Sequence, residues 1–247
     1  MIKFFRHIRQ RLVTENKLSK YLLYAIGEII LVVIGILIAL SINNWNQDRL
    51  NKSEEQNYLK AIKTDLKKDS LNLNHLINNI DIQLTTLGKL KKDLDSESLT
   101  IQQNVPFTSS LLNTFSFVPE KSTIQDLVSS GKLNLLANKQ VKDTLLSYYN
   151  TIDTSIFALN TSLIEYSRNT IAPFLMTYYT LEFNYPESLI TENSNLVTLT
   201  TEQKQSQFLS NAVKYRIAIL SSLKSSYEAL IIQINGFQKT LDTKIKK

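Results

Sequence analysis

Cysteine is absent from this sequence, and glycine, proline and histidine are scarce. The 247 residues include no Cys, 5 Gly, 4 Pro and 2 His. Without thiols the chain forms no disulfide, no Fe–S cluster, no thiolate zinc site and no cysteine nucleophile. It also carries no phosphate-binding loop, no dinucleotide fingerprint, no Gly-x-Ser-x-Gly elbow and no His-Glu-x-x-His motif. We therefore expect no catalytic, cofactor-binding or metal-binding residues, and a protein that is not an enzyme.

Positive charge is concentrated at one end of the chain. The formal net charge is +6, and residues 1–20 hold six Lys or Arg against Glu15 alone. From residue 29 onward the chain holds 22 bases and 20 acids, so it is nearly neutral. Nucleic-acid binding needs a concentrated basic surface to contact phosphates. We therefore expect no nucleic-acid partner.

A long apolar stretch follows the basic end. Glu28 is the one charged residue between positions 20 and 48, and residues 29–42 are almost wholly apolar. About 20 apolar residues are enough to cross the ~30 Å hydrocarbon core of a bilayer. Trp45 and the polar residues beside it have the character of an interfacial flank. We predict a transmembrane helix with its flank over residues 21–47.

The basic residues also predict the orientation of this helix. Short segments rich in Lys and Arg stay on the cytoplasmic side, so residues 1–20 are expected as a cytoplasmic tail and residues 48–247 as a domain outside. The tail is expected to bind anionic lipid. A cleaved signal peptide is the rival interpretation, because Ala39 and Ser41 loosely fit a cleavage site. The long basic lead-in, Glu28 and the length of the apolar stretch favour an uncleaved anchor.

Several positions in the span are candidates for contact with another helix. Gly27, Gly35 and Ala39 fall on one helical face, and small residues four apart allow helices to approach closely. Glu28 has three interpretations: pairing at the interface, contact with a partner helix, or proton-coupled chemistry. Trp45 is the candidate membrane-interface residue at the far end. Association with a second copy or with an envelope protein is expected through these positions.

Two motifs in the sequence are distinctive. Residues 24–40 read YAIGEIILVVIGILIAL and are followed by INNWN at 42–46, and a weaker motif, LVSSGKLNL, occupies 127–135. In these motifs the chain resembles a family of uncharacterised bacterial single-pass membrane proteins, classed as a domain of unknown function. The resemblance implies an anchor in the bacterial inner membrane with a helical domain in the periplasm. It implies nothing about an activity or a substrate.

Three later segments space their stripe residues alternately three and four positions apart, as in helices that pack along one stripe. The first stripe comprises Leu59, Ile62, Leu66, Asp69, Leu73, Leu76, Ile80, Gln83, Leu87, Leu90 and Leu94. The second begins after a helix start near Asn138 and comprises Leu145, Tyr149, Ile152, Ile156, Leu159, Leu163 and Tyr166. The third follows a capping box at residues 200–203 and comprises Val213, Ile217, Leu220, Lys224, Tyr227, Ile231, Ile234, Gln238, Leu241 and Ile245.

These stripes predict an all-α fold. After the transmembrane helix we expect an elongated antiparallel bundle of three long helices with short connecting helices. The first bundle helix should be continuous with the span, because no Pro or Gly lies between the two until Gly88. Pro173 should bend or end the second helix. An up-down-up order would make the first and third helices parallel.

Polar residues within the stripes predict how the first and third helices align. Asp69 and Gln83 are fourteen residues apart in the first stripe, and Lys224 and Gln238 are fourteen apart in the third. Polar seam residues commonly fix the register of packed helices. For parallel helices, this spacing predicts that Asp69 faces Lys224 and that Gln83 faces Gln238.

The connections between the helices are less regular. Residues 96–137 are expected to cover the membrane-distal end of the bundle. Within them, a capping box at Ser122–Gln125 predicts a short helix to about Ser130, ended by a left-handed Gly131. For the aromatic segment from Phe174 to Tyr185, packing in the core, contact with the membrane and a binding site all remain open.

Two functional hypotheses fit this architecture. The first is a non-enzymatic envelope protein, anchored in the membrane, that acts through protein–protein interaction. The alternative is a periplasmic sensory or ligand-binding helical domain that signals through a separate partner. They differ in a measurable way, because a ligand that binds the folded domain raises its melting temperature.

Overall fold

The computed structural model describes residues 18–95, 110–181, 196–198 and 203–245. The chain divides into two compact units, Met1–Glu55 and Gln56–Lys247, and each is considered by itself. Predictions about the basic tail up to residue 17, the connection 96–109, the aromatic residues Phe183 and Tyr185, and the first three residues of the 200–203 capping box lie outside the described residues.

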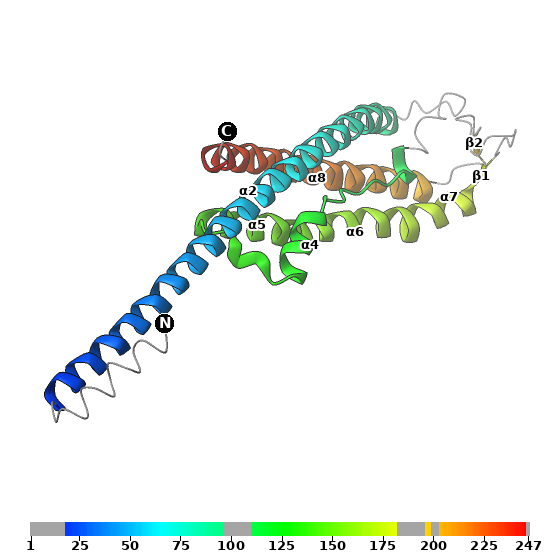
Figure 1. Cartoon of the computed structure of the whole chain (residues 1–247). Coiled ribbons are helices and arrows are strands. Elements are labelled where there is room, and N and C mark those ends of the chain that lie inside the picture. Colours follow the sequence, from blue (N-terminus) through cyan, green and yellow to red (C-terminus); the bar gives the residue numbers. More distant parts are fainter. Residues whose placement is uncertain (1–17, 96–109, 182–195, 199–202, 246–247) are drawn as a thin grey trace, which may run out of the picture. The chain divides into compact units, whose positions relative to one another are not determined.

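The fold is all-α, as the sequence predicts (Figure 1). The helical elements are α2 (Leu18–Asp95), α4 (Ser122–Ser129), η2 (Lys132–Leu135), α5 (Lys139–Thr151), η3 (Ile152–Ile156), α6 (Phe157–Glu165), η4 (Tyr166–Ile171), α7 (Ala172–Tyr178) and α8 (Gln203–Lys244). Two short strands that the sequence does not signal, β1 (Tyr179–Leu181) and β2 (Leu196–Thr198), pair antiparallel with Thr180 opposite Val197.

The first long helix is unbroken from Leu18 to Asp95, which confirms the predicted continuity. No proline interrupts it, so its ladder of backbone hydrogen bonds needs no break. In the second unit its stripe is confirmed almost completely: every predicted position from Leu59 to Leu94 is buried except Gln83, which is half-buried. Residues on the opposite face, such as Leu71 and Ile82, are exposed.

The second long helix is a continuous run of α5, η3, α6, η4 and α7. It begins at Lys139, which confirms the predicted start near Asn138, and Asn138 caps it by accepting a hydrogen bond from the Val141 N–H at 3.0 Å. Pro173 does not end this helix, which was one of the two predicted outcomes, because the chain stays helical to Tyr178. The segment η4, directly before Pro173, is π-helical. Pro173 itself is the second residue of α7, so the helix continues through it.

The π-helical segments η3 and η4 also change which side chains of the second helix face the core. Buried positions are three, four and four residues apart in repetition, an eleven-residue period rather than the predicted seven. The residues with this spacing are Tyr149, Ile152, Ile156, Asn160, Leu163, Ser167, Ile171 and Phe174, and Tyr148, Tyr166 and Leu175 are buried beside them. Asn160 therefore takes the buried position predicted for Leu159, which is half-buried.

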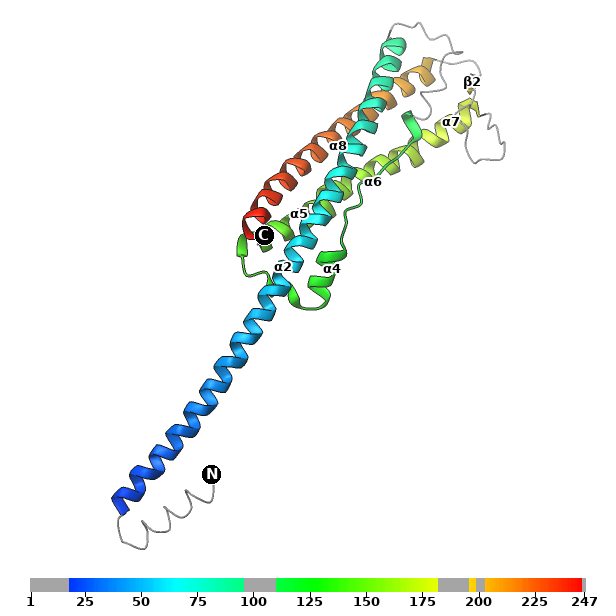
Figure 2. The same cartoon turned by 45° about the horizontal axis from the view of Figure 1, so that its top comes forward.

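The predicted order of helix directions is wrong. Hydrogen bonds join Gln56 to Lys244, Lys63 to Asp242 and Asp81 to Lys224, so α8 runs antiparallel to α2. The two helices lie side by side in both views of this unit (Figures 1 and 2). The direction of a helix depends on the connection before it, which the spacing of apolar residues does not reveal.

The connection between α2 and α5 explains this order. Its described part returns along the bundle: the Asn113 carbonyl contacts the α8 residue Arg216, Glu120 contacts Lys68, and Asp126 contacts Tyr58. As the residue number in the connection rises, the residue number of its neighbour on α2 falls, from the level of Gln83 to Lys68 and then to Tyr58. The second helix then starts near the first turns of this unit and runs parallel to α2. From residue 110 onward, the connection is therefore a layer along the side of the bundle rather than the predicted cover of its end.

Within this connection the short helix α4 ends as predicted. Gly131 adopts a left-handed conformation, with φ of 70°, which costs glycine little because it has no Cβ. The predicted capping box is wrong, because Lys121 occupies the N-cap position and makes no side-chain capping bond. Ser122 is the first helical residue instead.

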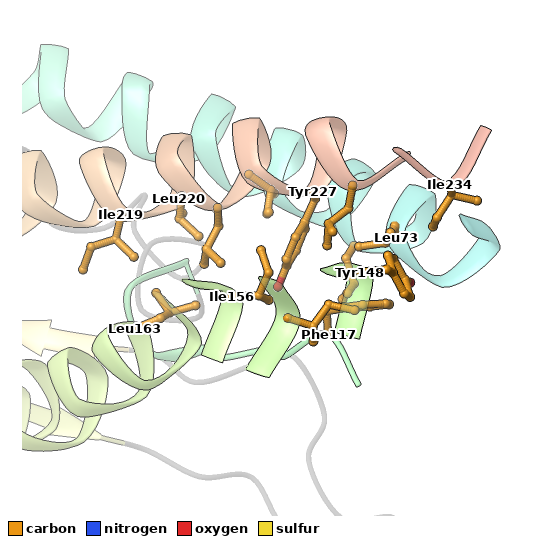
Figure 3. Close-up of a cluster of buried hydrophobic side chains, with 14 of the residues drawn as sticks. Leu73, Phe117, Tyr148, Ile156, Leu163, Ile219, Leu220, Tyr227 and Ile234 are labelled. Carbon is orange, nitrogen blue, oxygen red and sulfur yellow. The ribbon is translucent and has the colours of Figure 1, made fainter. Parts of the chain in front are cut away.

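The core of the bundle is formed by apolar side chains from all three long helices and from the 113–121 segment. Figure 3 shows Leu73 of α2, Phe117 of the connection, Tyr148 and Ile156 of the second helix, and Tyr227 of α8 converging in one cluster. The Tyr227 ring projects from α8 toward the second helix, with its hydroxyl at the far end (Figure 3).

Candidate functional site

The apolar stretch of α2 is a candidate membrane span. From Ile29 to Ile42 its large apolar side chains are between 45 and 66% exposed, on every side of the helix. A helix that is apolar all round needs an apolar environment on every side. By length and composition α8 also passes as a candidate span, but its apolar stripe is buried in the bundle core, as in a soluble protein.

The predicted helix-association positions lie on this stretch. Gly35, Ala39 and Trp45 are exposed, and Gly27 and Glu28 are half-buried. A Cβ added at Gly27 or Gly35 would meet no atom within 4 Å. The described residues therefore do not fill the face that these small residues form.

The predicted register pairs are wrong. Asp69 does not face Lys224, which instead donates to Asp81 Oδ1 at 2.5 Å near the surface. Gln83 does not face Gln238, because its Oε1 accepts a hydrogen bond from Arg216. Since α8 is antiparallel to α2, equal spacing in the two helices does not bring the pairs together.

In α8, every second position of the predicted stripe up to Gln238 is half-buried, and the residue just before it is buried instead. Val213, Leu220, Tyr227, Ile234 and Leu241 are buried as predicted. The positions between them are filled by Arg216, Leu223, Leu230 and Phe237 rather than by Ile217, Lys224, Ile231 and Gln238, which are half-buried. Arg216 was missed because a charged residue is normally assigned to a solvated face.

Arg216 is the most unusual buried side chain of the bundle, because its exposed fraction is 0%. Its Nη1 donates to Ser167 Oγ at 2.9 Å, and its Nη2 donates to Gln83 Oε1 at 3.0 Å and to the Asn113 carbonyl. The guanidinium carbon lies 6.0 Å from the centre of the Tyr166 ring, within the range of a cation–π contact. Its Nε has no hydrogen-bond partner.

The charge of Arg216 has no acidic counterpart among the described residues, where none of the ion pairs involves it. All its hydrogen-bond acceptors are neutral: a hydroxyl, an amide and a backbone carbonyl. Burial lowers the pKa of Arg216 to about 10, with the nearby Tyr166 as a smaller opposing influence. A buried cation without an anion is costly, since desolvation is not offset by a countercharge.

The partners of Arg216 are positioned by an irregular part of the second helix. Tyr166 and Ser167 are the first two residues of the π-helical segment η4. The Tyr166 hydroxyl donates to the Ala212 carbonyl of α8 at 2.8 Å, and Ser167 donates to the Leu111 carbonyl at 3.4 Å. Segments with π-helical turns often occur at functional sites, so we take Arg216 and its partners as the candidate site.

A second buried polar cluster surrounds Asp69. Its Oδ1 accepts from the Glu120 N–H and its Oδ2 from the Tyr148 hydroxyl, both at 2.8 Å. The Tyr149 hydroxyl donates to the Glu120 carbonyl at 2.6 Å. Both backbone groups of Glu120 are thus held, which fixes the connection before α4 against α2 and α5. Asp65, one turn before Asp69, is also buried, and its Oδ2 has no hydrogen-bond partner.

Burial dominates the electrostatics of this second cluster. Desolvation raises the pKa of the Asp69 carboxyl, and the hydrogen bonds from Glu120 and Tyr148 oppose that shift. The pKa of the Tyr148 hydroxyl is raised above its ordinary value by burial and then by the charge of Asp69. Such a cluster links three segments of the chain but presents no reactive group at the surface.

For the aromatic segment, the structure answers the question of its role at one residue, Phe174. Phe174 is buried and stacks on Phe208 of α8, with ring centres 4.3 Å apart, which supports packing for that residue. Met176, two residues on, is 73% exposed. Within the described ranges, no three His, Cys, Asp or Glu side chains lie together in a way that could hold a metal ion.

Comparison with known proteins connects the chain to one family. A family described as "Family of unknown function (DUF6090)" matches residues 28–212, about three quarters of the chain. No curated protein and no solved structure matches the chain significantly. The match begins inside the apolar stretch of α2 and covers the second helix and the start of α8, including Ala212. The chain therefore belongs to this family of unknown function, DUF6090.

Proposed function

We propose that this protein is a single-pass membrane protein of the bacterial inner membrane that acts through protein–protein interaction. The observation that carries the proposal is that α2 is apolar on every side from Ile29 to Ile42. Exposing such a surface to water is unfavourable, and a stretch of this kind is typical of a membrane span. The helical unit from Gln56 onward has its own core and is the part that we assign to the periplasm.

The orientation follows from charge. Residues 1–20 carry six Lys or Arg against one acid, which favours retention in the cytoplasm. We assign these residues to a basic tail on the anionic inner leaflet, residues 21–47 to the span and its flank, and residues 48–247 to the periplasmic domain. The small residues Gly27, Gly35 and Ala39 are the candidate contact face for a second copy or an envelope protein.

A role without catalysis is supported by the state of the buried charges. Asp69 and Arg216 are both buried in the bundle: Asp69 accepts hydrogen bonds from Glu120 and Tyr148, and Arg216 donates to Ser167 and Gln83. This arrangement holds helices together and offers no reactive group to a substrate in solvent.

Cysteine labelling tests the topology, because the native chain has no cysteine that would react. Ser19→Cys and the exposed Ser130→Cys are treated with a membrane-impermeant maleimide in cells whose outer membrane alone is permeabilised. We expect labelling at position 130 but not at 19, with the cysteine-free chain as the blank. The reverse pattern would put the bundle in the cytoplasm and overturn the proposed orientation.

The interaction itself is tested on the full chain extracted in mild detergent. We expect a second copy or an envelope protein to co-purify in a fixed ratio. Replacing Gly35 by Leu should break that association if it uses the small-residue face, whereas Leu71→Ala, on the exposed face of the bundle, should leave it intact. A chain that purifies alone and monomeric would contradict the proposal.

The buried Arg216 favours a second candidate, a ligand-binding or sensory domain that signals through a separate partner. A cation held by neutral groups alone has the chemistry of an anion site. A panel of small metabolites that includes both anions and neutral compounds separates the two candidates. A ligand-dependent rise in the melting temperature of the full chain supports the second, and its absence across the panel contradicts it.

A further inference from the structure

The guanidinium of Arg216 has one edge whose donors are incompletely used. Nε–H and one Nη2–H lie in the guanidinium plane and point in the same direction, with a spacing that matches the two oxygens of a carboxylate. On this edge Nε has no partner, while Nη2 contacts Gln83 Oε1 and the Asn113 carbonyl. The opposite side is fixed, since Nη1 is held by Ser167.

Two residues that accept hydrogen bonds at this edge reach the surface, one on α2 and one on the 113–121 segment. They are Gln83, which is half-buried, and Asn113, which is exposed. Ser167 and Tyr166, on the helix opposite, are buried. A ligand would therefore have to approach from the side of Gln83 and Asn113 rather than from the side of Tyr166 and Ser167.

The charge balance indicates the class of ligand. One guanidinium carries one positive charge, and its other neighbours are a hydroxyl, an amide, a carbonyl and an aromatic ring. A ligand with a single negative charge neutralises this set, whereas a doubly charged phosphate would leave excess charge buried. A planar carboxylate also fits the two parallel donors of one guanidinium edge.

We propose that the Nε–Nη2 edge of Arg216 binds the carboxylate group of a small monocarboxylate. The ligand replaces Gln83 Oε1 on Nη2 and supplies the missing partner of Nε. This inference names the ligand class of the ligand-binding candidate and does not depend on the interaction role. If another metabolite stabilises the chain while carboxylates do not, the ligand-binding function stands and this inference fails.

Thermal unfolding of the full chain in one fixed detergent tests the proposal, with acetate as the probe. Sodium acetate is titrated against sodium chloride and sodium phosphate at matched ionic strength. We expect acetate to raise the melting temperature by roughly 5 to 10 °C at a hundredfold excess over its Kd. A shift no larger than that in chloride, or an equal shift in phosphate, would overturn the proposal.

Two variants and a control make the result specific to the site. Arg216→Met should abolish the acetate response. The matched variant Arg168→Met, which removes an exposed arginine of η4 next to Ser167, should retain it. Because Arg216→Met alters the core, Gln83→Glu provides a second variant that keeps the arginine. Its carboxylate should pair with Arg216, raise the melting temperature without ligand, and remove the acetate response. A Gln83→Glu chain that responds like the wild type would also overturn the proposal.

Discussion

The two halves of α2 are both rich in apolar residues, but they distribute them differently. From Ile29 to Ile42 the apolar side chains surround the helix and are at least 45% exposed. From Leu59 to Leu94 they form one stripe, and the apolar members of the stripe are at most 9% exposed. The comparison shows that the distribution of apolar residues around a helix, more than their number, indicates the environment for which it is built.

The stripe should give the largest effect on stability. Leu73→Ala removes a fully buried side chain and should lower the free energy of unfolding by about 2 to 5 kcal/mol. Leu71→Ala, two residues away but 60% exposed, should change it by no more than about 0.5 kcal/mol. Denaturant unfolding of the full chain in one detergent measures both. Equal losses would mean that this half of α2 is not one-sided.

The all-round half should respond to charge instead. Ile36→Lys puts a cation in the middle of the candidate span, at a cost of roughly 3 kcal/mol for membrane insertion. We expect less of the chain in the carbonate-washed membrane fraction. Leu71→Lys serves as the control, because that position is exposed in the bundle half. An unchanged membrane fraction for Ile36→Lys would argue that the stretch contacts protein rather than lipid.

The second helix offers a case between these two, since its buried stripe includes a polar residue. The Tyr227 hydroxyl donates to Asn160 Oδ1 at 2.9 Å in the core. Tyr227→Phe leaves that oxygen without a donor and should lower the free energy of unfolding by about 1 to 3 kcal/mol. Tyr215→Phe, at an exposed ring of α8, should have almost no effect. If Tyr227→Phe left the free energy of unfolding unchanged, water or another group would have to replace the lost hydrogen bond.

The smallest effect is expected from pH at Asp69. Its pKa in the folded chain is raised by burial above the ordinary value of 3.8. A folded state that holds its proton more tightly gains stability below the ordinary pKa and loses it as the pH rises through the raised one. Asp69→Asn cannot ionise, so the variant should gain stability relative to the wild type between pH 4 and neutrality. A relative loss over that range would mean that the hydrogen bonds from Glu120 and Tyr148 outweigh desolvation.

The sequence predicts the stripe of α2 well because one column of Leu and Ile is flanked by polar residues. In α8 two neighbouring columns are both partly apolar, since Ile217 and Ile231 lie beside Arg216 and Leu230. Periodicity alone cannot choose between such columns. Packing buries the charged Arg216 in the core. The candidate site could not be predicted from the sequence, because charged residues usually lie at the surface.

Two other features were beyond what periodicity contains. The direction of α8 relative to α2 follows from the path of residues 113–138, whose contacts join residues far apart in the chain. The shift from Leu159 to Asn160 follows from η3, because a π-helical segment changes the spacing of buried residues without a mark in composition. The cap at Asn138 and the turn at Gly131 were predictable, since each depends on a residue with a local conformational preference.

The π-helical segments have a consequence for changes in chain length. A turn with bonds five residues back holds one residue more than the α-helical turn it replaces. A single-residue deletion within 152–156 would therefore be absorbed as a regular turn, leaving the chain helical. Because the regular turn takes the place of the π-helical one, the later side chains would keep their directions, and Asn160 and Ser167 would still face α8. A deletion within the α-helical segment α6 has no extra residue to remove, so it would rotate every later side chain by about 100° about the helix axis. The second helix therefore tolerates a lost residue in η3 but not in α6.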